Sequence, residues 1–290
     1  MQTQTNTHAT GDVLRYTAFS SDPSGGNPAG VVLDASGLDD SARLAIAAGL
    51  GYSETAFLTA PPEGLGEPGR AFTLRFFSPL AEVSFCGHAT VATAVALAER
   101  RGPGEFVFAT PAGTVPVEVD EQLRATLTSV EPHTEEVPAA ALAEALAALD
   151  WQAADLDPSF PIRIAYAGAR HLVLAAATRD RLSRLDYDFD RLTTLMRAHD
   201  LTTVQLVWRE SGTVFHVRDP FPVGGVVEDP ATGAAAAALG AYLREYGLVG
   251  AAARLTLHQG ADMGRPGLLG VELREGDPRV RVTGTATRIG

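Results

Sequence analysis

The chain has 290 residues and a formal net charge of −12, from 35 acidic and 23 basic residues. An acidic chain whose basic residues form no stripe is not expected to track a nucleic-acid backbone. It contains no lysine, which excludes a Schiff base and a Walker-type phosphate lysine. Its single cysteine, Cys86, excludes an internal disulfide and a pair of catalytic thiols within one chain.

Metal, membrane and targeting signals are also missing from the sequence. The closest two of the seven histidines, His199 and His216, are 17 positions apart, so no local metal cluster is visible. No apolar run approaches the roughly 18 residues of a membrane helix, and residues 1–12 lack a signal-peptide pattern. We therefore expect a cytoplasmic protein with no membrane or nucleic-acid partner and no metal.

Predicted strands dominate the first half, as β-branched and aromatic runs separated by turns rich in Gly and Pro. These strands cover residues 13–19, 30–33, 56–59, 72–77 and 105–108. A helix is expected over residues 39–49, opened by Asp39 and Asp40, and an amphipathic helix over residues 139–151.

Two further helices have an unusual composition. The first covers residues 88–101, is small or apolar on every side from Ala89 to Ala98, and is closed by Gly102 and Pro103. The second covers residues 233–243 and repeats this composition about half a chain length later. A helix that is apolar all round is enclosed by other structure, so the sequence indicates a duplicated lobe.

A helix of Ala, Thr and Gly is thin enough for a curved sheet to close around it. We expect an α+β fold with two pseudo-symmetric lobes, each a mostly antiparallel sheet wrapped around a central helix. Residues 1–120 with 278–290 would form the N-terminal lobe, and residues 121–277 the C-terminal lobe. Helix N-termini attract anions, so two of them facing one cleft would bind a carboxylate.

One string resembles a dinucleotide-binding fingerprint. Residues 64–69 match G-x-G-x-x-G, but they follow two prolines and lead into a predicted strand instead of a helix. We interpret the string as a turn.

Three side chains are candidates for chemistry. Glu54 starts a predicted strand, and the alternation of the strand puts it on the same, buried side as Ala56 and Leu58. A carboxyl in an apolar setting has a raised pKa and can exchange protons near neutral pH. His88 opens the first enclosed helix, and Asp229 lies in the turn before the second. Each has a structural alternative: a solvated strand-end carboxylate, a backbone-bonded helix residue and a helix cap, respectively.

Cys86 and His88 raise a separate hypothesis, a thiol–imidazole pair for acyl transfer. Their spacing of two positions across a glycine gives no reason for the side chains to meet. We expect Cys86 to be a buried packing residue.

Five ordered motifs make the sequence similar to the PhzF family, the phenazine-biosynthesis isomerase and its relatives. The motifs are Gly26–Leu33, Ser53–Phe57, Phe85–Thr90, Glu228–Gly233 and Gln259–Pro266. The resemblance covers nearly the whole chain and implies the diaminopimelate-epimerase-like fold, with a cleft between two lobes.

The resemblance also implies roles for individual residues. Glu54 matches the acid/base carboxylate that moves a proton between substrate carbons without a cofactor. His88 and Asp229 match residues that orient the substrate, and Asn27 lies in the first motif as a substrate-binding candidate. Backbone donors for a substrate carboxylate are implied at Gly87, Thr232 and Gly233.

Related racemases of this fold use two cysteines, one before each enclosed helix, but the second turn here has no thiol. The leading hypothesis is a homodimeric, cofactor-independent isomerase or epimerase acting on a small carboxylate. The alternative is a non-catalytic protein of the same fold that binds or sequesters a small acid.

Overall fold

A computed structural model describes residues 12–290, which contain six α-helices and 18 strands joined in one continuous sheet. The helices are α1 (Asp40–Leu50), α2 (Gly87–Arg101), α3 (Ala139–Ala148), α4 (Arg179–Ser183), α5 (Phe189–Ala198) and α6 (Gly233–Glu245). The strands of the first half are β1 (Val13–Ala18), β2 (Asn27–Val32), β3 (Glu54–Thr59), β4 (Ala71–Phe77), β5 (Glu82–Val83), β6 (Gly104–Thr110), β7 (Gly113–Val119), β8 (Ala125–Thr128) and β9 (His133–Glu136). Those of the second half are β10 (Arg163–Tyr166), β11 (Arg170–Ala175), β12 (Thr203–Arg209), β13 (Val214–Pro220), β14 (Glu228–Asp229), β15 (Ala253–Gln259), β16 (Gly267–Leu273), β17 (Val280–Gly284) and β18 (Ala286–Arg288).

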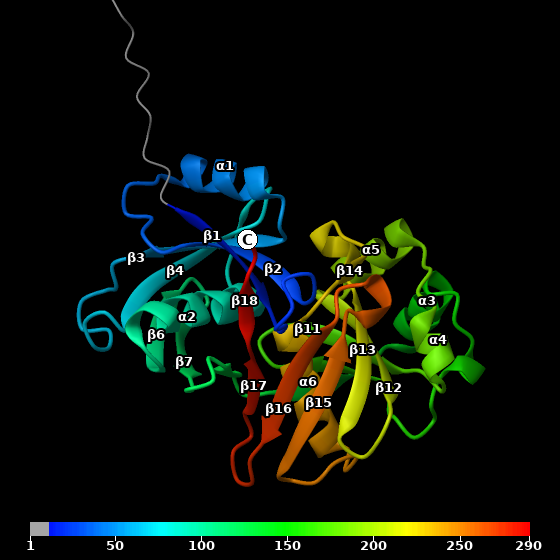
Figure 1. Ribbon diagram of the computed structural model, residues 1–290. Helices are drawn as coiled ribbons and strands as arrows, with labels where there is room; N and C mark the ends of the chain where they lie inside the picture. The colour runs from blue at the N-terminus through cyan, green and yellow to red at the C-terminus, as the bar shows by residue number, and fades with distance from the viewer. Residues whose placement is uncertain (1–11) are drawn as a thin grey trace, which may run out of the picture.

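The sheet curls into two lobes that lie side by side (Figure 1). In the first, which we call the α2 lobe, β18, β1, β2, β3, β4, β6, β7 and β8 pair in that order around α2. In the second, the α6 lobe, β16, β15, β13, β12, β11, β10 and β9 pair in that order around α6. Strand β17 pairs with β8 on one edge and β16 on the other, and so joins the lobes. The predicted division of the chain at residues 120 and 278 stays a prediction.

The two lobes repeat one order of elements. The first runs β1, β2, α1, β3, β4, β5, α2, β6, β7, β8, and the second runs β10, β11, α4 and α5, β12, β13, β14, α6, β15, β16, β17. The four parallel pairs fall at matching places, β2 with β3 and β4 with β6, then β11 with β12 and β13 with β15. All other strand pairs are antiparallel. The predicted duplication and the α+β fold class are therefore confirmed.

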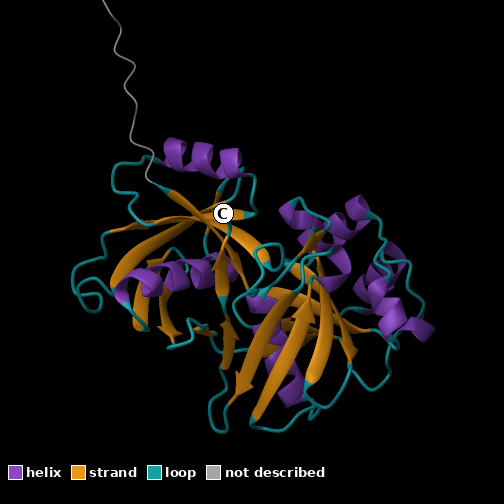
Figure 2. Ribbon diagram, viewed as in Figure 1, coloured by secondary structure: helices purple, strands orange, loops and turns teal. Residues whose placement is uncertain are grey.

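Helices α2 and α6 are enclosed, while α1 and α3–α5 lie outside the sheet (Figure 2). Every residue of α2 from His88 to Ala98 is buried, as is every residue of α6 from Ala235 to Leu243. Small side chains allow this closeness: a Cβ placed on Gly240 would lie 2.7 Å from a methyl of Val271 on β16. The buried hydroxyls of Thr90 and Thr93 donate to carbonyls one turn earlier, at 2.7 Å each, so they need no water.

The predicted elements are found with shifted ends. Asp39 caps α1 through a bond from the backbone N–H of Ala42, and Gly102 closes α2. Helix α3 is shorter than predicted and ends at Ala148, because Asp150 adopts a left-handed φ of 51° that ends the helix before Trp151. The string at residues 64–69 forms turns before β4, as interpreted. Among the helices of residues 12–290, none has the length and apolarity needed to cross a bilayer.

Candidate active site

Glu54 is the first residue of β3 and lies opposite Ala29 of the parallel strand β2. The face of β3 that carries Ala56 and Leu58 is buried, as predicted, but the opposite face with Thr55 and Phe57 is buried too. Helix α2 covers one face of the strand and α1 the other, which alternation alone did not indicate. The Glu54 side chain keeps 15% of its surface exposed, and burial raises the pKa of its carboxyl.

His88, the second residue of α2, faces this carboxyl. Its Nε2 lies 3.4 Å from Glu54 Oε2 and 3.3 Å from Ser53 Oγ, and its Nδ1 lies 3.2 Å from the amide nitrogen of Asn27. An amide nitrogen only donates, so Nδ1 accepts from Asn27 and the ring proton belongs on Nε2, toward Glu54. Burial lowers the pKa of His88, which keeps the imidazole neutral at pH 7.

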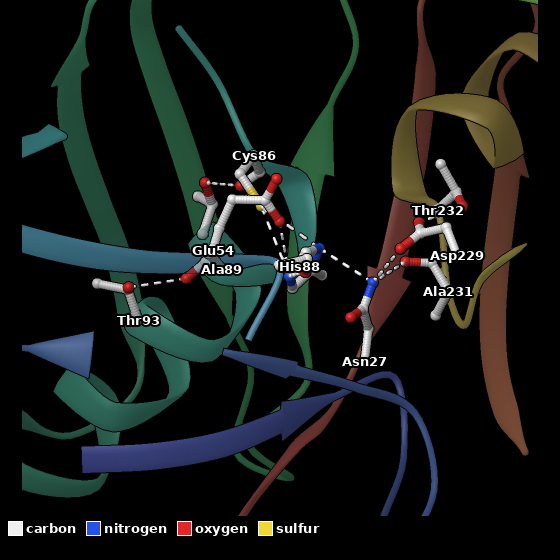
Figure 3. Close-up of polar contacts among 11 residues, drawn as sticks. Asn27, Glu54, Cys86, His88, Ala89, Thr93, Asp229, Ala231 and Thr232 are labelled. Atoms are coloured by element: carbon white, nitrogen blue, oxygen red, sulfur yellow. Dashed lines mark hydrogen bonds and ion pairs between the residues drawn. The ribbon is translucent and has the colours of Figure 1, made fainter. Parts of the chain in front are cut away.

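Cys86 completes a compact triad with these two residues. Its Sγ lies 3.3 Å from His88 Nδ1 and 3.6 Å from Glu54 Oε2 (Figure 3). The expectation that Cys86 and His88 would not meet was wrong. Cys86 is the N-cap of α2, with φ −144° and ψ 111°, and an N-cap side chain folds over the next two or three residues. Burial and the nearby Glu54 carboxylate raise the pKa of the Cys86 thiol well above its usual range, so it remains a thiol.

Asn27, the first residue of β2, links the triad to the α6 lobe. Its Nδ2 donates to Asp229 Oδ1 at 2.8 Å and also lies 3.1 Å from the carbonyl oxygen of Ala231 (Figure 3). Asp229 ends the two-residue strand β14 and does not cap α6, whose N-cap is Thr232. Burial raises the pKa of Asp229 to about 6, although the hydrogen bonds that it accepts from Thr232 and Asn27 favour the ionised form and lower the pKa.

Gln259 on β15 holds the turn before α6 in shape. Its Oε1 accepts from the backbone N–H of Thr232 at 2.9 Å, and its Nε2 donates to the backbone carbonyl of Asp229 and to Thr232 Oγ1, both at 2.9 Å. The Thr232 hydroxyl in turn donates to Asp229 Oδ2. Asp229 therefore accepts side-chain bonds from both lobes.

The N-termini of α2 and α6 meet at this point. A Cβ placed on Gly87 would lie 4.0 Å from the Cα of Gly233, so the first residues of the two helices are in contact distance. Their N–H groups have no acceptor within the helix, and both helix dipoles present their positive ends here. The predicted arrangement of two helix N-termini at one place is thus present, and it can hold an anion.

The structure brings all seven predicted site residues into one region: Asn27, Glu54, Gly87, His88, Asp229, Thr232 and Gly233. Sequence reasoning assigned no role to Ser53 or Gln259, although both lie in the motifs that carried the family resemblance. Their position in those motifs was the signal. It weighed a thiol–imidazole pair of Cys86 with His88 and expected a packing role for Cys86, whereas the Cys86 sulfur contacts both Glu54 and His88.

Comparison with known proteins agrees with this fold and site. Residues 16–289 match the family model described as phenazine biosynthesis-like protein. The chain is 32% identical to the uncharacterized isomerase YfhB of Bacillus subtilis, covering 95% of each chain. It is 31% identical to the trans-2,3-dihydro-3-hydroxyanthranilate isomerase of Pseudomonas fluorescens, covering 94% of this chain and 95% of that one.

A solved structure has the same two-lobed fold. The crystal structure of a PhzF-family phenazine biosynthesis protein from Bacillus anthracis superposes with a TM-score of 0.84 at 26% identity, covering 96% of each chain. The diaminopimelate-epimerase-like fold implied by the motifs is thereby confirmed. By its whole-length family match and its isomerase relatives, this chain belongs to the phenazine biosynthesis-like (PhzF) family of isomerases.

Proposed function

We propose that the protein moves a proton between carbons of a small carboxylate-bearing metabolite, with Glu54 as the general acid/base and without a cofactor. One observation carries the proposal. A largely buried carboxyl with a raised pKa lies beside the place where two helix N-termini meet. A proton-exchanging group and an anion-binding site next to each other suit a substrate whose reacting carbon is close to its carboxylate.

The reaction has two half-steps. The Glu54 carboxylate removes a proton from a carbon made acidic by a neighbouring carboxylate or alkene, and the electron pair of that C–H bond moves into the adjacent bond. The protonated Glu54 then returns the proton to another carbon on the same face. The N–H groups at the starts of α2 and α6 hold the substrate carboxylate and stabilise the charge that develops on it.

The neighbours of Glu54 orient the reactants. Neutral His88 donates from Nε2 toward Glu54 or a substrate oxygen, and Asn27 fixes the ring through Nδ1. Asp229 accepts from Asn27 and Thr232, and so fixes the direction of the Asn27 amide. A relative whose name gives an anthranilate-type substrate supports a cyclic or amino-acid-like carboxylate as the substrate class.

The test measures proton exchange directly. The protein is incubated in deuterated water with a panel of cyclic and amino-acid-like carboxylates, and deuterium incorporation is followed by NMR and mass spectrometry. Glu54→Gln keeps shape and polarity but cannot cycle a proton, so exchange should fall by about 10²-fold or more. Glu63→Gln, in an exposed loop, is the matched control and should exchange like the wild type.

Two outcomes would contradict the proposal. If folded Glu54→Gln retains more than about a tenth of wild-type exchange, another group is the acid/base. If the wild type binds carboxylates but exchanges none of their carbon-bound protons, the protein is a binding or sequestering protein of this fold.

A further inference from the structure

We propose that a cluster of buried polar side chains in the α6 lobe binds a protonated amino group of the substrate, with Asp219 as its counter-ion. This inference rests on the proposed function, because it names a second group on the carboxylate that the site would bind. The cluster consists of His171 on β11, Thr203 and Gln205 on β12, and Asp219 on β13. All four residues are at most 1% exposed.

The cluster lies on the face of the sheet that α6 covers. The residues two positions further along the three strands on this face, Val173, Val207 and Val217, belong to the apolar core around α6. Parallel pairing of β11 with β12 places His171 opposite Thr203. The inner face of the lobe is therefore apolar in its depth and polar at one end of these strands.

This polar end adjoins the site described above. Asp219 lies directly opposite Asp229 in the antiparallel pair of β13 with β14. Residues that are directly opposite in such a pair have their side chains on the same face. Asp229 in turn accepts from Asn27 of the other lobe and from Thr232, the N-cap of α6. The cluster is thus next to the carboxylate at which the two lobes meet.

The duplication of the chain gives the cluster the same place in its lobe that Glu54 has in the other. Strand β12 follows β11 in the second lobe as β3 follows β2 in the first, and both pairs are parallel. Thr203 is the first residue of β12, as Glu54 is the first residue of β3. Both positions are at the strand end near the start of the enclosed helix, so each lobe contributes polar side chains there.

Hydrogen bonds within the cluster leave several polar atoms unused. The Thr203 hydroxyl donates to Asp219 Oδ1 at 2.8 Å, so its oxygen accepts from His171 Nδ1, which is 2.8 Å away. With the proton on Nδ1, Nε2 of the neutral ring is an acceptor. Four side-chain atoms of the cluster have no partner within residues 12–290: His171 Nε2, Asp219 Oδ2, and Nε2 and Oε1 of Gln205. Buried polar atoms without a partner are unfavourable, so their concentration here indicates a binding position.

The types of these atoms fit a primary ammonium group. Three of them are acceptors, on an imidazole, a carboxylate and an amide, and a primary ammonium has three N–H donors. The fourth atom, Gln205 Nε2, is a donor and suits an oxygen of the same substrate. A second carboxylate would meet three acceptors and only one donor, so an anionic group does not fit the cluster.

The surrounding charges also favour a cation. Burial raises the pKa of Asp219 well above its usual range, and the Asp229 and Glu228 carboxylates raise it further. A positive group beside Asp219 offsets both effects and favours the ionised carboxylate. Paired with that carboxylate, the ammonium would be a buried charge with a partner, which is the condition under which buried charges are tolerated.

The test compares matched pairs of carboxylates that differ only in the amino group. One member carries an amine on the second, third or fourth carbon, and the other carries a hydroxyl there, as in 2-aminocyclohexanecarboxylate and 2-hydroxycyclohexanecarboxylate. Deuterium exchange gives kcat/KM for each member, and calorimetry on the full-length protein gives its affinity. For the best pair we expect the wild type to favour the amine by at least about 10²-fold, because sites with buried polar groups reject analogues that leave them unpaired.

Asp219→Asn should reduce this preference at least about tenfold. The readout is the ratio within a pair, because a general disturbance of the site lowers both members equally. Gln205→Leu, which removes two of the four unpartnered atoms, should reduce the ratio in the same direction. The matched control is Asp180→Asn, which removes the same charge from a side chain that is 75% exposed and should leave the ratio unchanged.

The possible failures are distinguishable. Equal kcat/KM values and equal affinities within every pair would overturn the subsite and leave the role of Glu54 standing. A preference that persists in folded Asp219→Asn would assign the amine to another carboxyl and also overturn the subsite. If no carboxylate exchanges protons, the proposed function fails, and the affinity ratios still test the subsite. Should Asp219→Asn not fold, Gln205→Leu replaces it, and a preference that is undiminished there overturns the proposal.

Discussion

Asn27 Nδ2 and Asp229 Oδ1 are 2.8 Å apart, although the residues are 202 positions apart in the chain and belong to different lobes. Both groups are buried, so this bond is not shared with bulk water. It fixes the orientation of the amide that also faces His88. The geometry beside Glu54 therefore depends on how the two lobes are docked.

Replacing Asn27 by Leu should impair both turnover and stability. The substitution keeps side-chain volume but leaves Asp229 with one donor fewer and His88 without its Nδ1 partner. Loss of a bond to a buried carboxylate costs about 1–3 kcal/mol of unfolding free energy, and turnover should fall at least about tenfold. Chemical denaturation and steady-state kinetics check this, with exposed Gln122→Leu as the control. Wild-type kinetics in the folded Asn27 variant would show that the link between the lobes does not shape the site.

Activity should fall as the pH drops below about 6, the value to which burial raises the pKa of Asp229. Above that pH the carboxylate is ionised and accepts from Asn27 and Thr232, and below it protonation weakens both bonds. Glu54, whose pKa is also raised by burial, titrates on the same side, and burial lowers the pKa of the His88 imidazole.

Thr232→Val separates the contributions of Asp229 and Glu54 to this transition. It removes the hydroxyl that donates to Asp229 and changes no bond of Glu54 or His88. The acid limb of the profile of kcat/KM against pH should move to higher pH in this variant. An unmoved limb would assign the transition to Glu54 alone.

His171 should make the fold less stable in acid. It is fully buried, its Nδ1 lies 2.8 Å from Thr203 Oγ1, and burial lowers its pKa to about 3. Below about pH 6.5 the unfolded chain binds a proton at this residue, whereas the folded protein does not. The free energy of unfolding therefore falls by up to about 1.4 kcal/mol for each pH unit as the pH drops from about 6.5 toward 3.

Urea unfolding at about pH 7 and pH 5 measures this contribution. The wild type should lose more stability than His171→Gln on acidification. The comparison with the variant is needed because buried Asp219, whose pKa is raised, acts in the opposite direction in both proteins. Equal losses would show that His171 is protonated in the folded state.

Cys86→Ala should fold and lower turnover by less than about tenfold. The substitution removes one sulfur atom and costs about 1 kcal/mol of stability, while Glu54 and His88 keep their mutual contact. Kinetics and denaturation of this variant are compared with the alkylated wild type. A folded but inactive variant, together with inactivation by alkylation, would assign the chemistry to the thiol.

Turnover should survive exhaustive chelation of metal ions and should require no added nucleotide. Glu54 transfers the proton itself in the proposed mechanism, so removal of a metal ion takes nothing from the reaction. Dialysis against a strong chelator, followed by the deuterium-exchange assay, checks this expectation. Activity that is lost on dialysis and regained with metal would contradict it.

Local patterns in the sequence were enough to predict much of the fold. Helices that are small on every side, such as Ala89–Ala98 of α2, are stable only inside other structure, and their repetition half a chain apart indicated two lobes. His88 at the start of α2, Asp229 in the turn before α6 and Glu54 at the start of β3 were singled out because helix starts and strand patterns are local features of the chain.

Only the tertiary structure decided which of these residues touch. The Asn27–Asp229 bond depends on how the two lobes dock, and the contact between Cys86 and His88 depends on the direction of an N-cap side chain. No periodic pattern of residues in the sequence indicates either feature. Ser53 and Gln259 acquire partners in the same way, from elements brought together by the closed sheet. Residue spacing determines secondary structure over a few turns, whereas the distances that create chemistry are set by packing between elements far apart in the chain.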